Sequence, residues 1–389
     1  MDYKKASLEL HKSLQGKVEM RSRIDIKSIE DLATVYSPGV SEPCLEIQRD
    51  PNLSYVYTRR HNTVAVITDG SAVLGLGNIG PLASMPVMEG KAVLFKLLAD
   101  VDAVPLCLKT QNTDEIVDTI YNLSDSFGGI NLEDIAAPRC FEIERRLKER
   151  CDIPIFHDDQ HGTAIVVLAA LINALKVVEK DVKDIKVVIN GIGAAGTAIA
   201  EFLIAFGVNN LLLCDKHGIL SSDDSSLSES HKIMAKKTNP LNVRGTLSKA
   251  LENADVFIGV SVPDCVTAED IKAMKKDPIV LPLANPKPEI AVDVAKAAGA
   301  KIIGTGLSNH PNQINNLLAF PGVFRGTLNA RSKEITKTMM IAAAEAIANS
   351  IPKSELKPDY IIPNPLDRSV HERVATAVKA NAIEKHVTE

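Results

Sequence analysis

Residues 185–215 read IKVVINGIGAAGTAIAEFLIAFGVNNLLLCD, and this stretch decides the fold. The β-branched run at 185–189 predicts a strand, and the alanine-rich run at 197–206 predicts a helix that ends at Gly207. Between them lies the glycine turn GIGAAG, and the apolar run after the helix ends in Asp215. A strand, G-x-G-x-x-G, a helix, a second strand and an acid stand in the order that a dinucleotide site requires. An ordinary strand-to-helix turn is the alternative, and the complete context favours dinucleotide binding.

The glycine turn is expected to hold a pyrophosphate. Glycines let the backbone turn tightly and approach the phosphates, and the amides at the helix N-terminus stabilise their charge. We expect NAD⁺, because Asp215 can accept hydrogen bonds from a ribose diol and would repel a 2′-phosphate. Lys216 and His217 follow directly and could instead bind that phosphate of NADP⁺. The residues expected to bind the cofactor here are Gly191, Ile192, Gly193, Ala194, Ala195, Gly196 and Asp215.

The composition is that of a globular protein with more than one domain. The chain has 389 residues, of which 45% are hydrophobic and 24% charged, so we expect two or three domains with ample core. A formal net charge of −5 without a basic block argues against nucleic-acid or membrane-surface partners. We also expect no apolar run as long as a membrane span and no signal peptide. The six cysteines include no C-x-x-C pair, which favours free thiols in a reducing cytoplasm.

The region before the dinucleotide stretch predicts a second α/β unit. Strand-like runs at 63–68, 103–108 and 153–156 alternate with helical runs. We therefore expect an N-terminal α/β domain at 1–157 and a doubly wound Rossmann-type domain with C-terminal helices at 158–389.

Two acidic doublets indicate a metal site. One doublet lies at 133–134, and the other, at 158–159, follows a short buried strand, where open α/β folds place their sites. Carboxylate oxygens suit Mg²⁺ or Mn²⁺. His157 and His161 raise the question of zinc, but H-x-x-x-H lacks the glutamate of the zinc-protease helix. An oxygen-liganded metal is favoured over zinc and over solvated surface acids.

Lys91 and Tyr36 are candidates for proton transfer, and each has a packing alternative. Lys91 lies among apolar residues before a helix expected at 92–99, where burial would lower its pKa and let it act as a base. Spacing alone favours a lysine whose head reaches solvent. Tyr36 lies on a loop that Pro38 and Gly39 make rigid. In isolation, a half-buried packing tyrosine is the favoured reading.

Other polar and glycine-rich segments also have both a functional and a purely structural interpretation. A second G-x-G-x-x-G at 75–80 is expected to be a loop that faces a small ligand, because prolines follow it and the next strand does not end in an acid. Asn285 and Asn316 could donate to a carboxylate or a nicotinamide amide, and turn formation is an equal alternative.

With these residues assembled, the chain resembles a malic enzyme of the small single-unit kind found in bacteria. The resemblance implies oxidative decarboxylation of (S)-malate to pyruvate and CO₂ with NAD(P)⁺ and a divalent metal. Each piece alone is unspecific, but together the pieces run from about residue 30 to 330 in the expected order. The matching stretches are TVYSPGV at Thr34, residues 68–91, INLEDIAAPRCFEIE at Ile130, FHDDQHGTA at Phe156, the GIGAAG turn, LANPKPE at Leu283 and NNLLAFPG at Asn315.

The resemblance also implies roles for the candidate residues. Tyr36 matches the family's tyrosine acid, Lys91 its lysine base, and Asp158 an acid that supports the lysine. The implied metal carboxylates are Glu133, Asp134 and Asp159. The implied residues near malate and nicotinamide are Lys91, Asn285 and Asn316.

One departure leaves a question open. Larger relatives carry an arginine for a malate carboxylate where this chain has Ser71 and Ala72, so the resemblance does not indicate which group binds that carboxylate. It implies a homodimer. The alternatives are a malolactic-type enzyme or an oxaloacetate decarboxylase on the same scaffold, and a non-catalytic dinucleotide-binding sensor.

Overall fold

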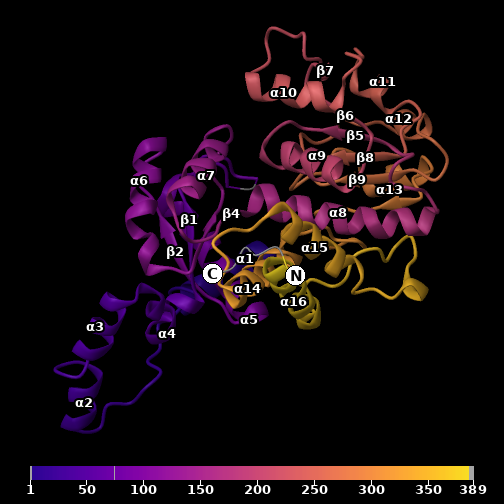
Figure 1. The fold of residues 1–389 in the computed structure, drawn as a ribbon. Helices are drawn as coiled ribbons and strands as arrows, with labels where there is room; N and C mark the ends of the chain where they lie inside the picture. Colours follow the sequence, from indigo (N-terminus) through magenta and orange to yellow (C-terminus); the bar gives the residue numbers. More distant parts are fainter. Residues whose placement is uncertain (1, 74, 385–389) are drawn as a thin grey trace.

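The computed structural model describes residues 2–73 and 75–384, and in them two β-sheets are flanked by helices (Figure 1). One sheet belongs to the N-terminal part of the chain and the other to the part after residue 185. Both sheets are parallel apart from one edge strand. The α/β fold expected from the sequence is therefore confirmed.

The first sheet has four parallel strands in the order β2-β1-β3-β4. These strands are β1 (Thr63–Thr68), β2 (Asp102–Cys107), β3 (Gly129–Leu132) and β4 (Ile155–His157). The helices that cover them are α5 (Gly80–Ala99), α6 (Thr113–Leu123) and α7 (Arg139–Arg150). Successive residues of β1 face opposite sides. Ala65 and Ile67 pack with α6 and α7, whereas Val64 and Val66 pack with α5.

The second sheet has six strands in the order β10-β9-β8-β5-β6-β7, and β7 is antiparallel to β6. These strands are β5 (Lys186–Asn190), β6 (Asn210–Asp215), β7 (Gly218–Ile219), β8 (Val256–Gly259), β9 (Ile279–Pro282) and β10 (Ile302–Ile303). From β5 the chain passes through α9 (Ala194–Phe206) to β6 on one side, and it later returns to β8 on the other side. The strand order thus reverses beside β5, which is where doubly wound sheets bind dinucleotides.

Helix α8 (Asp158–Val178) leads from the first sheet to the second. It is long and apolar enough to cross a membrane, so the expectation that no run reaches this length is wrong. The reason that such a helix occurs here is packing: 67% of its apolar window is buried, and it lies against α9 and α15 (Lys337–Ala348). It is a core helix, which explains why apolar residues occupy every side of it.

The C-terminal helices return to the first sheet. Helix α14 (Phe320–Ala330) packs against both α5 and α16 (Arg368–Glu384). The ring of Phe320 lies 4.7 Å from that of Phe95 in α5. The last part of the chain therefore helps to cover α5, on which Lys91 lies.

The N-terminal helices contribute little to this core. They are α1 (Tyr3–Leu14), α2 (Ile29–Val35), α3 (Ser41–Arg49) and α4 (Ser54–Tyr57), and none contains a buried residue. In Figure 1, α2 and α3 project away from the two sheets. We call residues 29–49 the N-terminal arm.

Short elements connect the main ones. They are η1 (Pro51–Leu53), η2 (Arg59–Asn62), η3 (Ser124–Ser126), α10 (Glu229–Thr238), α11 (Leu247–Leu251), α12 (Ala268–Lys272), α13 (Val292–Ala297), η4 (Asn316–Leu318) and η5 (Lys353–Glu355).

Two helices begin earlier than the sequence predicts. Helix α5 begins at Gly80 instead of residue 92, because Pro81 is compatible with a first turn and the helix continues through Pro86. The apolar run at 163–178 predicts a helix from Thr163, but helix α8 begins at Asp158, since acidic side chains are stabilised in the first turn of a helix. Lys91 therefore lies within a helix, and the second acidic doublet occupies a helix N-terminus.

Candidate active site

A cavity of about 670 Å³ is lined by residues from both halves of the chain. Asp134 and Asp159 contribute from the first sheet, and Asn285 contributes from the loop after β9 of the second. The loops that follow parallel strands meet here, as expected for an α/β site. Gly75 and Gly77 of the second glycine sequence also line this cavity, whereas Leu74 lies outside the described residues.

Three carboxylates form a cluster at this cavity. Each of Glu133, Asp134 and Asp159 offers an oxygen within 4.8 Å of the others. Neighbouring strands cause this proximity, because β3 leads into the first doublet and β4 into the second. The backbone N–H of Asp134 also donates to Oδ2 of Asp159 at 2.7 Å.

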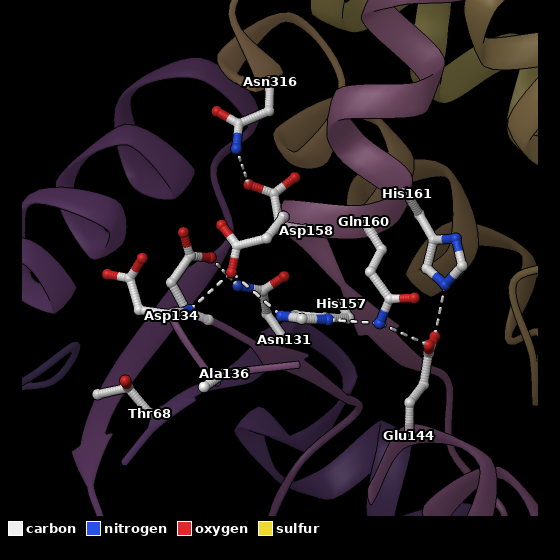
Figure 2. Close-up of polar contacts among 12 residues, drawn as sticks. Thr68, Asn131, Asp134, Ala136, Glu144, His157, Asp158, Gln160, His161 and Asn316 are labelled. Carbon is white, nitrogen blue, oxygen red and sulfur yellow. Dashed lines mark hydrogen bonds and ion pairs between the residues drawn. The ribbon is translucent and has the colours of Figure 1, made fainter. Parts of the chain in front are cut away.

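The cluster fits a hard divalent cation. Glu133 and Asp134 are each 5% exposed, and burial raises the pKa of Glu133 well above its ordinary value, outweighing the attraction of Lys91. Adjacent buried carboxylates repel one another unless a cation balances them. All three donors are oxygens, which suits Mg²⁺ or Mn²⁺. His161 turns away from the cluster and pairs with Glu144 at 2.7 Å, so it does not support the zinc alternative (Figure 2).

Lys91 faces carboxylates, not the apolar setting that the sequence predicted. Its Nζ donates to Oε1 of Glu133 at 2.9 Å and also to Oδ2 of Asp158, and it lies 4.0 Å from the ring centre of Phe320. Burial alone would lower the pKa of Lys91, but the charges of Asp158 and Glu133 outweigh burial and raise it. The expectation of a neutral lysine in an apolar pocket is therefore wrong for the chain without a bound cation.

Asp158 connects Lys91 to the second half of the chain. Its carboxylate is buried, and Nδ2 of Asn316 donates to its Oδ2 at 2.7 Å (Figure 2). A Cβ atom at position 162 would lie 1.8 Å from Oδ1 of Asp158, so Gly162 is the residue that leaves room for this carboxylate. The structure thus brings Lys91, Asp158 and Asn316 into one connected group.

A chain of buried polar groups extends behind the cluster. His157 Nε2 lies 3.1 Å from Oδ2 of Asp159, and Gln160 Nε2 lies 2.5 Å from His157 Nδ1. Gln160 also donates to Glu144 at 3.3 Å, as Figure 2 shows. Because Gln160 donates to Nδ1 of His157, the other ring nitrogen, Nε2, carries the proton and donates to Asp159. This arrangement orients a cluster carboxylate.

Tyr36 does not lie at the 670 Å³ cavity of its own chain. It caps the C-terminal end of α2, 70% of its surface is exposed, and it does not line the cavity. The rigid loop that was predicted around it belongs to the N-terminal arm, which projects from the two sheets (Figure 1).

The glycine turn has the geometry expected for close backbone approach. Gly191 has φ +118°, and a Cβ on Gly196 would lie 1.8 Å from the carbonyl oxygen of Gly191. Helix α9 begins at Ala194, so its N-terminus points into the turn. Gly193, Ala194 and Ala195 line the 670 Å³ cavity beside Asn285.

A second cavity of about 490 Å³ begins on the other side of the turn. Ile192, Asp215, Lys216 and His217 line it. Oδ1 of Asp215 accepts from the backbone N–H of His217 at 2.7 Å, which fixes the carboxylate at the end of β6. Ser261 lines both cavities, so the two cavities adjoin at this residue.

Several residues at the site were not predicted. Asn131 donates to Glu133 at 2.8 Å, and Phe320 lies against Lys91. Asn131 carries a signal that could have been used, because it is the one polar residue of the buried strand β3. Phe320 carries none, since a phenylalanine in an apolar helix normally indicates core.

Ser71 is occupied by contacts of its own. Its Oγ donates to Asp69 and accepts from the backbone N–H of Ala136 at 2.9 Å. Among the described residues that line the 670 Å³ cavity, none is lysine or arginine. No lysine or arginine in the described lining of this cavity can therefore take the place of the arginine that binds a malate carboxylate in larger relatives.

Two parallel sheets, a glycine turn at a reversal of strand order and a carboxylate cluster at the same cavity define a two-part α/β enzyme that uses a dinucleotide. Comparison with known proteins agrees. The family profile for the N-terminal domain of malic enzyme matches residues 15–148, and that for the malic enzyme NAD binding domain matches residues 160–383. The chain belongs to the malic enzyme family.

Individual relatives are similar over nearly the whole chain. A bifunctional malic/malolactic enzyme of Bacillus subtilis is 52% identical over 100% of this chain and 95% of its own length. An NAD-dependent malic enzyme of Geobacillus stearothermophilus is 53% identical over 93% of this chain and 76% of its own. The crystal structure of an NAD-dependent malic enzyme from Thermotoga maritima has a TM-score of 0.93 at 51% identity and covers 96% of this chain and 98% of its own.

Proposed function

We propose that this protein oxidises (S)-malate and decarboxylates it to pyruvate and CO₂, with reduction of NAD(P)⁺ and dependence on a divalent metal. One observation carries the proposal: Asp134 and Asp159 of the carboxylate cluster line the same cavity as the glycine turn, and Lys91 donates to Glu133 of that cluster. Hydride transfer needs the dinucleotide near C2 of malate. Loss of CO₂ needs a cation near the oxygen that is bonded to C2. Both requirements are satisfied at a single place in the chain.

We assign the first proton transfer to Lys91. The C2 hydroxyl must lose a proton while hydride leaves C2, and Nζ of Lys91 is the basic group beside the cluster. Glu133, Asp134 and Asp159 would hold the cation, which would supply Lewis-acid stabilisation of the charge that develops as CO₂ leaves. A cation held there would offset the carboxylate charges that raise the pKa of Lys91, which would favour its role as a base.

We assign the second proton transfer to Tyr36 of a partner subunit. The enol left by decarboxylation needs a proton at C3, and the tyrosine of the same chain lies away from the cavity. Helices α1 to α3 bury no residue and expose large apolar side chains, Ile29 at 76% and Leu32 at 43% among them. A homodimer that covers these side chains and carries Tyr36 to the neighbouring cavity accounts for both features.

NAD⁺ is the proposed cofactor in preference to NADP⁺. The carboxylate of Asp215 is fixed at the end of β6 and faces the 490 Å³ cavity, where its charge disfavours a 2′-phosphate. Lys216 and His217 line the same cavity and are the residues that would favour NADP⁺. A kcat/KM for NADP⁺ well above that for NAD⁺ would overturn this choice.

The remaining proposals concern organisation. We propose that the chain divides at 157/158, where β4 passes into α8. We also infer a cytoplasmic location, which is supported by the six free thiols.

A turnover assay with malate, Mn²⁺ and either NAD⁺ or NADP⁺ tests the reaction. We expect pyruvate together with reduced cofactor. A malolactic reaction is the second candidate, favoured by the name of the Bacillus subtilis relative. It would give lactate and CO₂ without net reduction of the cofactor, and product analysis separates the two.

A further inference from the structure

Glu289 is a buried carboxylate that the proposed reaction does not use. It has no exposed surface, and it follows the loop after β9. Its Oε1 accepts from the backbone N–H of Ser261 at 2.7 Å and from Ser261 Oγ at 3.4 Å. Its Oε2 accepts from the backbone N–H of Ala284 at 3.1 Å. The hydrogen bonds described for Glu289 therefore come from neutral donors, and none comes from a lysine, arginine or histidine.

The residues that Glu289 holds belong to the path of the cofactor. Ser261 lies in the loop after β8 and lines both the 670 Å³ and the 490 Å³ cavities. Ala284 lies after β9, lines the larger cavity, and is followed directly by Asn285. Nδ2 of Asn190, the residue before the glycine turn, donates to Ser261 Oγ at 2.8 Å. One carboxylate thus connects the ends of β5, β8 and β9 at the cofactor path.

The chemistry of this position requires an acceptor on both oxygens. An ionised carboxylate has only acceptor sites, so it can satisfy donors from two loops at once. An amide of the same shape would place an N–H₂ group against a backbone N–H and leave that buried donor without a partner. A Cβ on Gly259 would lie 2.4 Å from Cδ of Glu289, so the backbone closes the space around the side chain and keeps it in place.

Burial without a cationic partner is costly for a carboxylate and raises the pKa of Glu289. A residue that only had to accept these backbone hydrogen bonds for the stability of the fold could be a neutral side chain, or a carboxylate nearer the surface. The cost is understandable if the two loops must be held at a fixed separation, because a dinucleotide passes between them.

We propose that Glu289 is a positioning residue of the cofactor site, which holds Ser261 and the Ala284-Asn285 segment at the separation that NAD(H) binding requires. This proposal rests on dinucleotide binding by the second sheet and assigns no proton transfer to Glu289. It predicts that changes at Glu289 act on cofactor binding before they act on malate binding or chemistry.

The test compares Glu289→Gln with a matched control, Asp270→Asn. Asp270 is also buried and also accepts from a backbone N–H and a hydroxyl, both of Thr267, but it lines neither cavity. The measurements are the dissociation constant of NADH from its own fluorescence, the KM values for NAD⁺ and malate, kcat, and the thermal midpoint. The chain has no tryptophan, so protein fluorescence interferes little with the NADH signal.

For Glu289→Gln we expect the NADH dissociation constant and the KM for NAD⁺ to rise about tenfold, as the loss of one buried hydrogen-bond pairing implies. The KM for malate should change by less than about threefold, and Asp270→Asn should leave all binding constants within about twofold at a similar loss of thermal midpoint. Glu289→Asp keeps both acceptor oxygens and should recover part of the lost affinity.

Two results would overturn the proposal. One is a Glu289→Gln protein that binds NADH as the control does, and the other is an equal change in both KM values. If Glu289→Gln does not fold, Glu289→Asp carries the test, and wild-type affinity in that folded variant rejects the proposal. Failure of the wild-type protein to bind NADH would instead contradict dinucleotide binding itself.

Discussion

A single ammonium, that of Lys91, is held between two carboxylates and an aromatic ring. The carboxylates of Glu133 and Asp158 and the ring of Phe320 come from three separate segments of the chain. The charges of the two carboxylates oppose burial and raise the pKa of Lys91. The pKa of Lys91 therefore depends on both its burial, which lowers it, and the carboxylates of Asp158 and Glu133, which raise it.

Substitution of Lys91 and Tyr36 should block different steps. Lys91→Ala should lower malate oxidation by about 10²–10⁴-fold, the usual contribution of a positioned base. Tyr36→Phe should instead impair protonation at C3, so it should slow exchange of the C3 protons of pyruvate with D₂O more than reduction of a supplied 2-keto acid. Solvent-deuterium incorporation, followed by NMR together with keto-acid reduction, measures both effects. Wild-type exchange in Tyr36→Phe would remove that tyrosine from the proposed mechanism.

Metal affinity should depend on Asp159 more than on an ordinary surface acid. Asp159→Asn should weaken Mn²⁺ binding by more than about 100-fold, because groups that only support metal ligands already contribute 10–100-fold. Asp125→Asn is the control, since that carboxylate is fully exposed and outside the cluster. Titration of Mn²⁺ by electron paramagnetic resonance measures binding without turnover. Equal affinity in the two variants would contradict the cluster assignment.

At the scale of elements, the ends of neighbouring strands place the functional residues. The sequence predicts strand 185–189 and helix 197–206, and the structure has β5 at 186–190 and α9 at 194–206. This part is predictable because β-branched runs, glycines and apolar periodicity act locally. The start of α5 is not, since its two prolines signal a break, and only the packing of the helix against the sheet shows why it continues.

An ion-pair cluster at the base of the second sheet should make stability depend on pH. Asp255 accepts from Lys180 at 3.0 Å and Lys275 at 2.7 Å, and from the backbone N–H of Lys186 at 2.8 Å. Burial would raise the pKa of Asp255, but these donors outweigh it and hold that pKa below its ordinary value. Its contribution is therefore fully present above the unfolded-state pKa of about 3.9 and is lost as pH falls through the lower folded-state pKa.

Asp255→Asn should lower the free energy of unfolding at pH 7 by about 1–3 kcal/mol, the usual range for hydrogen bonds to a charged group. The difference from the wild type should shrink as pH falls below about 4, because the unfolded wild-type chain then binds a proton at Asp255, whereas the folded chain binds it only at lower pH. Urea unfolding at a series of pH values measures it. A difference that stays constant between pH 7 and pH 3 would show that the ion pairs do not cause it.

For the whole molecule, one chain does not complete the proposed site. Tyr36 lies on the N-terminal arm, whose apolar side chains are exposed, and the cavity that needs an acid lies elsewhere. The sequence could predict the tyrosine as a candidate but not its distance from Lys91, because arm and cavity are related only through three-dimensional packing. The two-part α/β architecture, by contrast, was predictable from strand and helix patterns alone.

Disruption of the N-terminal arm should dissociate the proposed dimer and lower activity at the same time. Leu32→Asp places a charge on the apolar arm, so we expect a monomer that still binds NADH but loses at least about 90% of the exchange of the C3 protons of pyruvate with D₂O, on the scale of a lost catalytic acid. Leu366→Asp is the control, because Leu366 is 66% exposed and lies outside the arm. Light scattering after gel filtration gives the mass of each variant. A fully active Leu32→Asp monomer would contradict a site shared between subunits.

The most direct test of the central claim is the ratio of products from (S)-malate, with reduced cofactor, pyruvate and CO₂ measured in the same reaction. If the joined cavities carry out oxidation and decarboxylation as proposed, the three should form in equal amounts with Mn²⁺, stop together when the metal is removed with a chelator, and return together when Mn²⁺ is restored. Release of CO₂ without reduced cofactor, or unchanged turnover after metal removal, would contradict the account.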